Sequence, residues 1–339
     1  MSSLNLGLML GYWGAQPPAD PISVAQEVER LGYESIWTAE SYGSDALTPL
    51  AYVASHTQRI KLGTAIVQIS ARTPAATAMA TLTLDHLTNG RMLLGLGVSG
   101  PQVVEGWYGQ PFSKPLTRTR EYVDIVRQVL RREGPVTHAG PHYPLPYTGE
   151  GAWGAGKPLR SIVHPLRADV PIFLGAEGPK NIALAAEIAD GWLPLYYSPY
   201  RQEVFADSLK DAKPGFQIAQ LVICNINDDL EAALMPVKAF LALYIGGMGA
   251  KDHNFHTQLM SRMGFEAEAV RIQDLYLQGK KAEATAMVPD RFADEISLCG
   301  PVDRIRDRLR AWRESPVTSL LVANQDAPTV RTMAELVLS

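Results

Sequence analysis

A glycine-rich stretch with the spacing G-x-G-x-x-G is the first candidate for ligand chemistry in this chain. It consists of Gly95, Gly97 and Gly100, and it follows an apolar run that has the character of a strand. In a dinucleotide-binding turn, a helix must begin at the last glycine so that its amino terminus faces the pyrophosphate. Here Pro101 and two further prolines follow, and we expect no helix before about Leu116. The stretch therefore favours tight packing at a strand end, or a ligand turn of another kind, over the dinucleotide fingerprint.

A second glycine turn is the stronger candidate for an anion site. The segment 173–191, FLGAEGPKNIALAAEIADG, runs from an apolar strand through the turn 175–178 into a helix that begins at Pro179. Proline suits the first helical position, and the free N–H groups and positive dipole end of that helix suit a bound phosphate. Gly178 would allow the anion to approach the backbone. A glycine that only turns the chain is the alternative interpretation.

Polar and aromatic residues follow other predicted strands. The segment 63–74 runs from a strand into the polar residues Ser70, Arg72 and Thr73. At the same mouth we expect a further set of side chains: Tyr12, Trp13, Trp37, Glu40, Gln68 and Trp107. A concave, aromatic and mildly polar mouth suits a flat, planar ligand. Each aromatic by itself is better explained by ordinary packing, and only their shared position at strand ends favours ligand contact.

Strands and helices alternate along the whole chain and would place these residues at one end of a sheet. The strands are expected at 4–10, 35–39, 60–67, 91–98, 171–176, 191–196, 216–226 and 317–323. Eight strand–helix repeats in a chain of 339 residues favour a (β/α)8 TIM barrel over an open sheet. In such barrels the loops after the strands form the active site.

Two stretches interrupt this alternation. Segment 134–170 is rich in proline and glycine, and we expect a loop insertion there after strand four. Segment 246–299 has helical patterns without a strand, and we expect a helical insertion between strands seven and eight. No linker or low-complexity tract separates the parts, so a single domain over 1–339 is the expectation.

The composition narrows the class of partner and the location. The net charge is −4 without any block of like charges, which disfavours a nucleic-acid partner. Cys224 and Cys299 are the only cysteines and lack metal-like spacing, so we expect neither a metal site nor a disulfide. The N-terminus lacks the pattern of a signal peptide, and the longest apolar stretch, 239–250, is too short for a membrane span. We expect a cytoplasmic protein.

Taken together, three stretches resemble the luciferase-like monooxygenase superfamily, in particular its coenzyme F420-dependent oxidoreductases. They are GYESIWTAE (32–40), the long block from Arg59 to Gly109, and FLGAEGPKNIALAAEIADGWLP (173–194). The long block is the most specific, with R-x-x-L-G, then R-x-P-x-x-x-A, then L-D-x-L-x-x-G-R leading into G-L-G. The resemblance implies a (β/α)8 barrel, a small organic substrate that hydride transfer converts, and usually a homodimer.

The resemblance also implies where the deazaflavin cofactor would lie. A bulge after strand three, containing a non-prolyl cis peptide bond that here falls at Ala65-Ile66, backs the ring near Gln68. The loop after strand four lies along the ring, and the turn after strand five holds the phosphate. The residues implied in these two roles are Val98, Ser99 and Gly100 for the loop, and Gly175, Ala176, Glu177 and Gly178 for the turn.

The chain departs from some members of this branch at the acid–base positions. Where sugar-phosphate and some alcohol dehydrogenases carry an acidic residue followed by histidine, this chain has Glu40 and Ser41. Where they carry a glutamate after the strand-four glycines, it has Pro101 after Gly100. Glu40 and Tyr108 are the remaining candidates for proton handling. An FMN-dependent monooxygenase and a non-catalytic flavin- or deazaflavin-binding protein stay open as alternatives.

Overall fold

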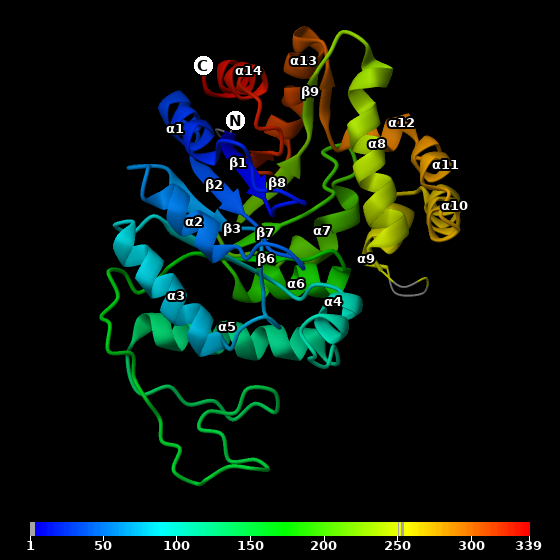
Figure 1. Ribbon diagram of the computed structural model, residues 1–339. Helices are drawn as coiled ribbons and strands as arrows, with labels where there is room; N and C mark the ends of the chain where they lie inside the picture. Colours follow the sequence, from blue (N-terminus) through cyan, green and yellow to red (C-terminus); the bar gives the residue numbers. More distant parts are fainter. Residues whose placement is uncertain (1–3, 250, 252–253) are drawn as a thin grey trace.

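Parallel strands close into a barrel in the computed structural model, which describes residues 4–249, 251 and 254–339 (Figure 1). The barrel strands are β1 Asn5–Gly11, β2 Ser35–Thr38, β3 Lys61–Thr64, β4 Val67–Gln68, β5 Met92–Gly97, β6 Ile172–Gly175, β7 Gly191–Leu193, β8 Gln217–Val222 and β11 Ser319–Val322. Segments β3 and β4 are two pieces of one barrel strand, and both pair with β5. The predicted eight-stranded barrel is therefore confirmed.

Helices between the strands surround the barrel. They are α1 Pro21–Leu31, α2 Leu47–Ala54, α3 Pro74–Leu87, α5 Pro115–Arg131, α6 Pro179–Ile188, α7 Glu203–Leu209, α13 Val302–Glu314 and α14 Ala327–Leu338. Local signals explain their ends. For α1, the Asp20 carboxylate accepts a hydrogen bond from Ser23 N, Pro21 occupies the first turn, and Gly32 ends the helix at a φ of 90°.

The segment 216–226 is not the single strand that the sequence predicts. It divides into β8 and β9, Cys224–Ile226, and β9 pairs with β10, Leu298–Gly300, in a separate two-stranded sheet. The expectation that 246–299 holds no strand is therefore wrong at its end. Each piece has only three residues, so the sequence alone does not reveal that they leave the barrel.

The helical insertion consists of α8 Leu230–Gly247, α9 Phe255–Arg262, α10 Glu266–Leu277, α11 Lys281–Ala286 and α12 Asp290–Glu295. It begins before residue 246, because α8 is already part of it. By length and composition alone, α8 would be apolar enough to cross a membrane. In this fold Leu234, Val237, Leu241 and Ile245 on α8 are buried in the core. These helices lie together beside one side of the barrel (Figure 1).

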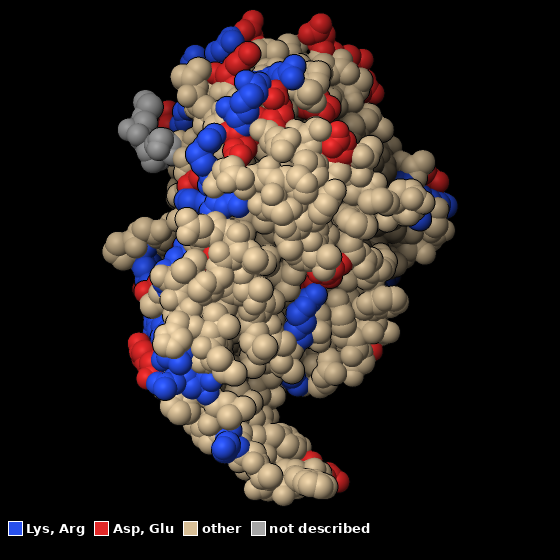
Figure 2. All heavy atoms as spheres, turned by 60° about the vertical axis from the view of Figure 1, so that its left-hand side comes forward, with Lys and Arg blue, Asp and Glu red and all other residues tan. Residues whose placement is uncertain are grey.

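Residues 134–170 form a projecting arm with little regular structure (Figure 1). Two isolated antiparallel bridges, Val136↔Leu159 and His138↔Leu145, hold its base. The arm is fixed to the barrel by Arg167, whose Nη2 lies 2.7 Å from Oδ1 of the buried Asp85 on α3. Figure 2 shows few charged side chains on the arm, while charges of both signs are scattered over the rest of this face.

Candidate active site

The glycines of the G-x-G-x-x-G stretch serve packing at two of three positions. A Cβ atom on Gly95 would lie 1.8 Å from Thr64 O, and one on Gly97 would lie 2.6 Å from Ile66 Cδ1. Ser99 takes the left-handed conformation with a φ of 60°, and Gly100 leads directly into α4, Pro101–Gly106. The expectation of no helix before Leu116 is wrong, because Pro101 starts a helix instead of preventing one.

This short helix does not restore the dinucleotide fingerprint. Helix α4 has only six residues. Two of the three glycines are required by neighbouring strands, so no open phosphate turn exists at Gly95 and Gly97. What remains open is the backbone at Gly100, where an added Cβ would meet only the end of the Gln102 side chain, 3.6 Å away.

The interruption between β3 and β4 brings together three predicted cofactor segments. The peptide bond between Ala65 and Ile66 is cis, as the family resemblance implies. Ile66 packs against the next two strands, because a Cβ on Gly175 would lie 3.2 Å from Ile66 Cγ2 and one on Gly97 would lie still closer. Ala65 and Ile66 also contact the apolar plug of the barrel around Trp37. The predicted ring-backing residues therefore form an apolar floor at the barrel mouth.

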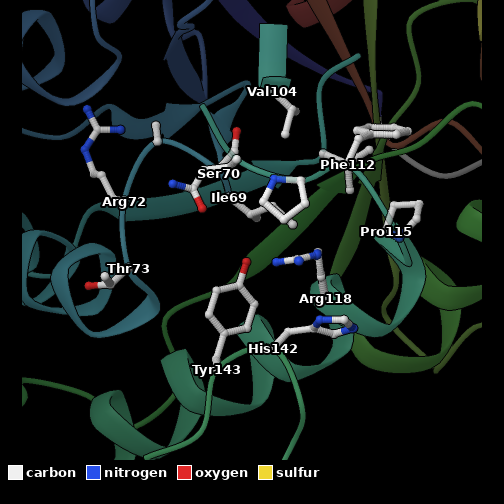
Figure 3. Close-up of a pocket in the computed structure, with 14 residues that line it drawn as sticks. Ile69, Ser70, Arg72, Thr73, Val104, Phe112, Pro115, Arg118, His142 and Tyr143 are labelled. Atoms are coloured by element: carbon white, nitrogen blue, oxygen red, sulfur yellow. The ribbon is translucent and has the colours of Figure 1, made fainter. Parts of the chain in front are cut away.

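A cavity of about 280 Å³ opens beside the loop after β5 (Figure 3). Val98 and Ser70 line it from the barrel, Arg118 from α5 and Tyr143 from the arm. Ser70 Oγ is buried and has no hydrogen-bond partner among the described residues. Burial raises the pKa of Tyr143, and its hydrogen bond with Arg118 opposes that rise. The cavity thus offers hydrogen bonds and the Arg118 guanidinium to a polar or anionic group.

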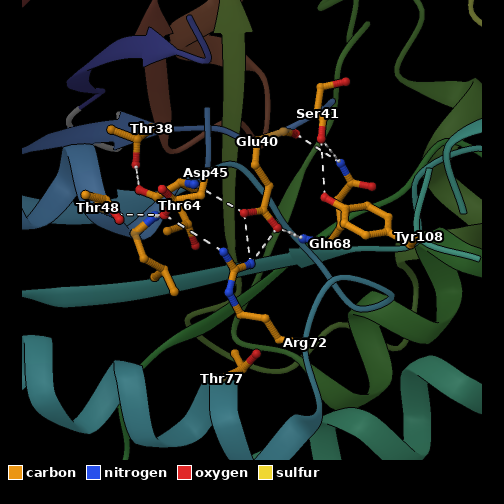
Figure 4. Close-up of polar contacts among 12 residues, drawn as sticks. Thr38, Glu40, Ser41, Asp45, Thr48, Thr64, Gln68, Arg72, Thr77 and Tyr108 are labelled. Carbon is orange, nitrogen blue, oxygen red and sulfur yellow. Dashed lines mark hydrogen bonds and ion pairs between the residues drawn. The ribbon is translucent and has the colours of Figure 1, made fainter. Parts of the chain in front are cut away.

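Glu40 lies at the end of β2, and both of its carboxylate oxygens accept hydrogen bonds (Figure 4). Its side chain is only 2% exposed. Oε1 accepts hydrogen bonds from Gln68 N at 2.8 Å and Arg72 Nη1 at 2.9 Å, and Oε2 accepts from Ala46 N at 3.2 Å and from the same Nη1. These hydrogen bonds occupy both carboxylate oxygens and fix the backbone on both sides of the mouth.

Gln68 and Tyr108 both donate hydrogen bonds to backbone carbonyl groups at the end of β2. The Gln68 side-chain amide donates to the carbonyl oxygens of Glu40 and Ser41, each at 3.3 Å, while its Oε1 is buried without a partner. The Tyr108 hydroxyl donates to Ser41 O at 3.3 Å. Burial, and secondarily Glu40, raise the pKa of Tyr108. The structure thus brings both proton-handling candidates to one place, and the free Gln68 oxygen can accept a hydrogen bond from a ligand.

The turn after β6 has the geometry of an anion site. An added Cβ on Gly178 would meet no atom within 4 Å, and α6 begins after it without a side-chain cap. The indole Nε1 of Trp192 donates to Ala176 O at 2.8 Å, which fixes the turn. Arg262, from α9 of the insertion, donates to Glu177 O at 2.7 Å and places a cation beside the turn. The sequence does not reveal the Arg262 contact, because 85 residues separate its two partners.

Glu177 itself points into a buried cluster that the sequence analysis missed. Its Oε2 lies 3.9 Å from Nδ1 of His256 on α9, and neither atom has a hydrogen-bond partner in the described part of the chain. The hydroxyl of Tyr196, just after β7, is also buried without a partner. The one sequence signal is an acidic residue between two glycines of an apolar turn. The location of His256 in the insertion gives no hint of this proximity.

Comparisons with known proteins agree with this architecture. The luciferase-like monooxygenase family model matches residues 6–319. A Mycobacterium tuberculosis protein whose name assigns it as a coenzyme F420-dependent oxidoreductase is 53% identical, with 99% of each chain covered. A 5,10-methylenetetrahydromethanopterin reductase of Methanolobus tindarius is 27% identical, covering 94% of this chain and 96% of the relative.

Solved structures show the same fold at lower identity. The coenzyme F420-dependent tetrahydromethanopterin reductase of Methanopyrus kandleri superposes with a TM-score of 0.77 at 23% identity, covering 99% of this chain and 98% of the other. An F420-dependent secondary alcohol dehydrogenase, solved with an F420–acetone adduct, has a TM-score of 0.73 at 17% identity, covering 100% and 99%. These two matches support the barrel architecture.

Proposed function

The chain belongs to the luciferase-like monooxygenase family, and from this premise we propose that it is a coenzyme F420-dependent oxidoreductase. The observation that carries the proposal is the 53% identity, over 99% of both chains, to the F420-dependent oxidoreductase of Mycobacterium tuberculosis. The reaction is a hydride transfer between the cofactor and a small organic substrate.

The residues present fit this cofactor. The Ala65–Ile66 floor and the backbone of Val98, Ser99 and Gly100 are suited to one flat ring, and the unpartnered Gln68 Oε1 is an acceptor for a ring N–H. The open turn Gly175, Ala176, Glu177 and Gly178, with the free N–H groups of α6 and the nearby Arg262 guanidinium, suits the phosphate.

When bound, the cofactor supplies a ring carbon that gives or takes a hydride. The protein's own contribution is to hold the ring, exclude water and position the substrate. We propose that Glu40 acts here as a positioning residue. Its carboxylate fixes Gln68 N and Arg72, and it leaves no free oxygen for a proton. Tyr108 then remains the proton-handling candidate on this side of the mouth.

The substrate is proposed only by class. The cavity beside Val98 borders the ring loop, and Arg118 and Tyr143 project into it. We therefore expect a substrate or cofactor portion with a polar or anionic substituent to extend into this space. A ketone and enone panel that contains carboxylated members is the natural first screen.

Separate titrations with F420 and FMN test the cofactor. We expect F420 to bind with at least tenfold higher affinity, a difference of about 1.4 kcal/mol, measured by fluorescence or calorimetry. Binding of FMN at micromolar affinity without binding of F420 would instead support the monooxygenase alternative. If F420 binds but its reduced form is not oxidised by any member of the panel, the non-catalytic cofactor-binding alternative is favoured.

We propose further that the protein is a cytoplasmic homodimer. The arm exposes several large apolar side chains, with Trp153 95%, Ile162 93% and Leu159 68% exposed. A second copy of the chain would bury them, as the family resemblance leads us to expect. The two cysteines, Cys224 and Cys299, are free and buried, consistent with a reducing compartment.

A further inference from the structure

We propose that Glu177 and His256 form a proton-sharing pair at the barrel mouth, which takes up a proton when the phosphate of the cofactor binds at the turn beside it. This inference rests on the proposed oxidoreductase function, and it gives Glu177 a role beyond shaping the phosphate turn. It also assigns a role in cofactor binding to the helical insertion, because His256 lies on α9.

In this pair, two buried atoms face each other, and neither has a hydrogen-bond partner among the described residues. Glu177 Oε1 accepts a hydrogen bond from Leu195 N at 3.2 Å, whereas Oε2 has no partner among residues 4–249, 251 and 254–339. His256 Nδ1 faces that oxygen at 3.9 Å and also lacks a partner. The two side chains are only 15% and 16% exposed. Buried polar atoms are ordinarily paired, so two that face each other without a hydrogen bond indicate a site that a proton or ligand completes.

The surrounding groups are polar but carry little charge. The rings of Tyr196 and Tyr244 lie 5.5 and 5.1 Å from the His256 ring, centre to centre. Tyr244 in turn lies near Tyr12 and Tyr42, which follow β1 and β2 at the mouth. The one cation beside Glu177 among the described residues is Arg262, and its Nη2 donates to the Glu177 carbonyl oxygen instead of the carboxylate. Among the described residues, the Glu177 carboxyl group therefore has no hydrogen-bonded cation, and its nearest titratable partner is His256.

Burial shifts the pKa values of Glu177 and His256 in opposite directions. It raises the pKa of Glu177 from 4.5 to about 8, with Leu195 N and Arg262 opposing the rise. It lowers the pKa of His256 from 6.5 to about 4. Near neutral pH the pair thus holds one proton between two basic atoms and carries no net charge. A group of this kind can give up a proton and recover it within the pH range of most cells.

The first experiment measures unfolding equilibrium constants between pH 4 and 8 for the wild type, Glu177→Gln and His256→Gln. Exposed Glu203→Gln serves as the matched control. A raised carboxyl pKa means that the unfolded chain loses its proton first, so the wild type should lose stability as pH rises from 4.5 to 8. A lowered histidine pKa means that the wild type should lose stability as pH falls from 6.5 to 4.

The variants separate the two contributions. Relative to wild type, Glu177→Gln should gain stability with rising pH, by up to about tenfold in the equilibrium constant per pH unit. His256→Gln should gain relative stability as pH falls below 6.5, and Glu203→Gln should follow the wild type throughout. Profiles of the two site variants that run parallel to wild type would overturn the pair. So would a Glu177→Gln variant that loses relative stability with rising pH, since that result indicates a permanently ionised carboxylate.

The second experiment measures how many protons the protein takes up when F420 binds. Calorimetric titrations at pH 8 and pH 6, each in two buffers of different ionisation enthalpy, give this number. A bound phosphate should keep Glu177 protonated, so wild type should take up about half a proton at pH 8 and almost none at pH 6. Glu177→Gln should take up none at either pH. Equal proton uptake by wild type and Glu177→Gln would overturn the proposed pair. If F420 binds to neither protein, the proposed function is overturned instead, and the stability profiles alone then test the pair.

Discussion

Two carboxylates at the barrel mouth have opposite surroundings, and this difference separates their roles. Glu40 accepts from two backbone N–H groups and from Arg72, so its charge is fully compensated. One oxygen of Glu177 has no partner, and burial penalises its charge. A compensated carboxylate holds its neighbours in place, and an uncompensated one is a better store for a proton.

The compensated state of Glu40 makes a stability prediction. Glu40→Gln removes the charge opposite Arg72, whose side chain is 24% exposed, and should lower the free energy of unfolding by about 1–3 kcal/mol. Chemical denaturation measures this change. The matched control is Glu187→Gln, which breaks an exposed pair with Arg120 and should cost less than about 1 kcal/mol. Equal effects of the two variants would contradict the positioning role of Glu40.

The open space at Gly178 makes a binding prediction. Gly178→Glu introduces bulk and negative charge where the phosphate is proposed to lie, and should weaken F420 binding at least tenfold, about 1.4 kcal/mol. Gly134→Glu is the control, because that glycine also has no atom within 4 Å of an added Cβ but belongs to the arm. Fluorescence titration of both variants measures the effect. Unchanged affinity of Gly178→Glu would contradict the phosphate site.

At the scale of elements, the mouth is assembled from pieces that are far apart in sequence. The cis peptide bond between β3 and β4 places Ile66 against Gly97 and Gly175 on the next two strands. The insertion adds Arg262 and His256 above the turn after β6. The arm adds Tyr143 to the cavity beside Val98. The barrel therefore provides the floor, and the two insertions provide much of the polar wall.

The attachment of the arm can be tested through its buried ion pair. Arg167→Met leaves Asp85, whose side chain is 2% exposed, without its cation and should destabilise the protein by about 2–4 kcal/mol. We also expect faster proteolysis within 134–170. Arg131→Met, which breaks an exposed pair with Asp169, should change the unfolding free energy by less than about 1 kcal/mol. An Arg167→Met variant as stable as this control would show that other contacts hold the arm.

At the scale of the whole molecule, the exposed apolar arm predicts assembly. We expect the wild type to sediment as a dimer and the double variant Trp153→Asp with Ile162→Asp to sediment as a monomer at micromolar concentration. Leu277→Asp, on the half-exposed end of α10, is the control and should remain dimeric. A monomeric wild type, or a double variant that stays dimeric, would contradict an interface at the arm.

The sequence allowed prediction of the barrel because its signals are local. Apolar runs, helix caps such as Asp20, and glycine turns repeat at each strand–helix unit, and each acts over a few residues. Where the prediction failed, a local signal had two meanings. Pro101 can end a regular segment or begin a helix, and 216–226 can be one strand or two. Only the packing of neighbouring elements distinguishes these cases.

By itself the sequence determined the eight-stranded barrel, the F420-type motifs and the position of the cis peptide bond, since these depend on short-range pattern and family likeness. Only the tertiary structure decided which polar groups are paired. In the folded chain Arg72 donates to the Glu40 carboxylate, Gly95 and Gly97 pack closely against the neighbouring strand, and His256 lies opposite Glu177. The physical reason is that burial and hydrogen bonding depend on atoms brought together from distant segments, and these contacts set the charge and proton occupancy of each group.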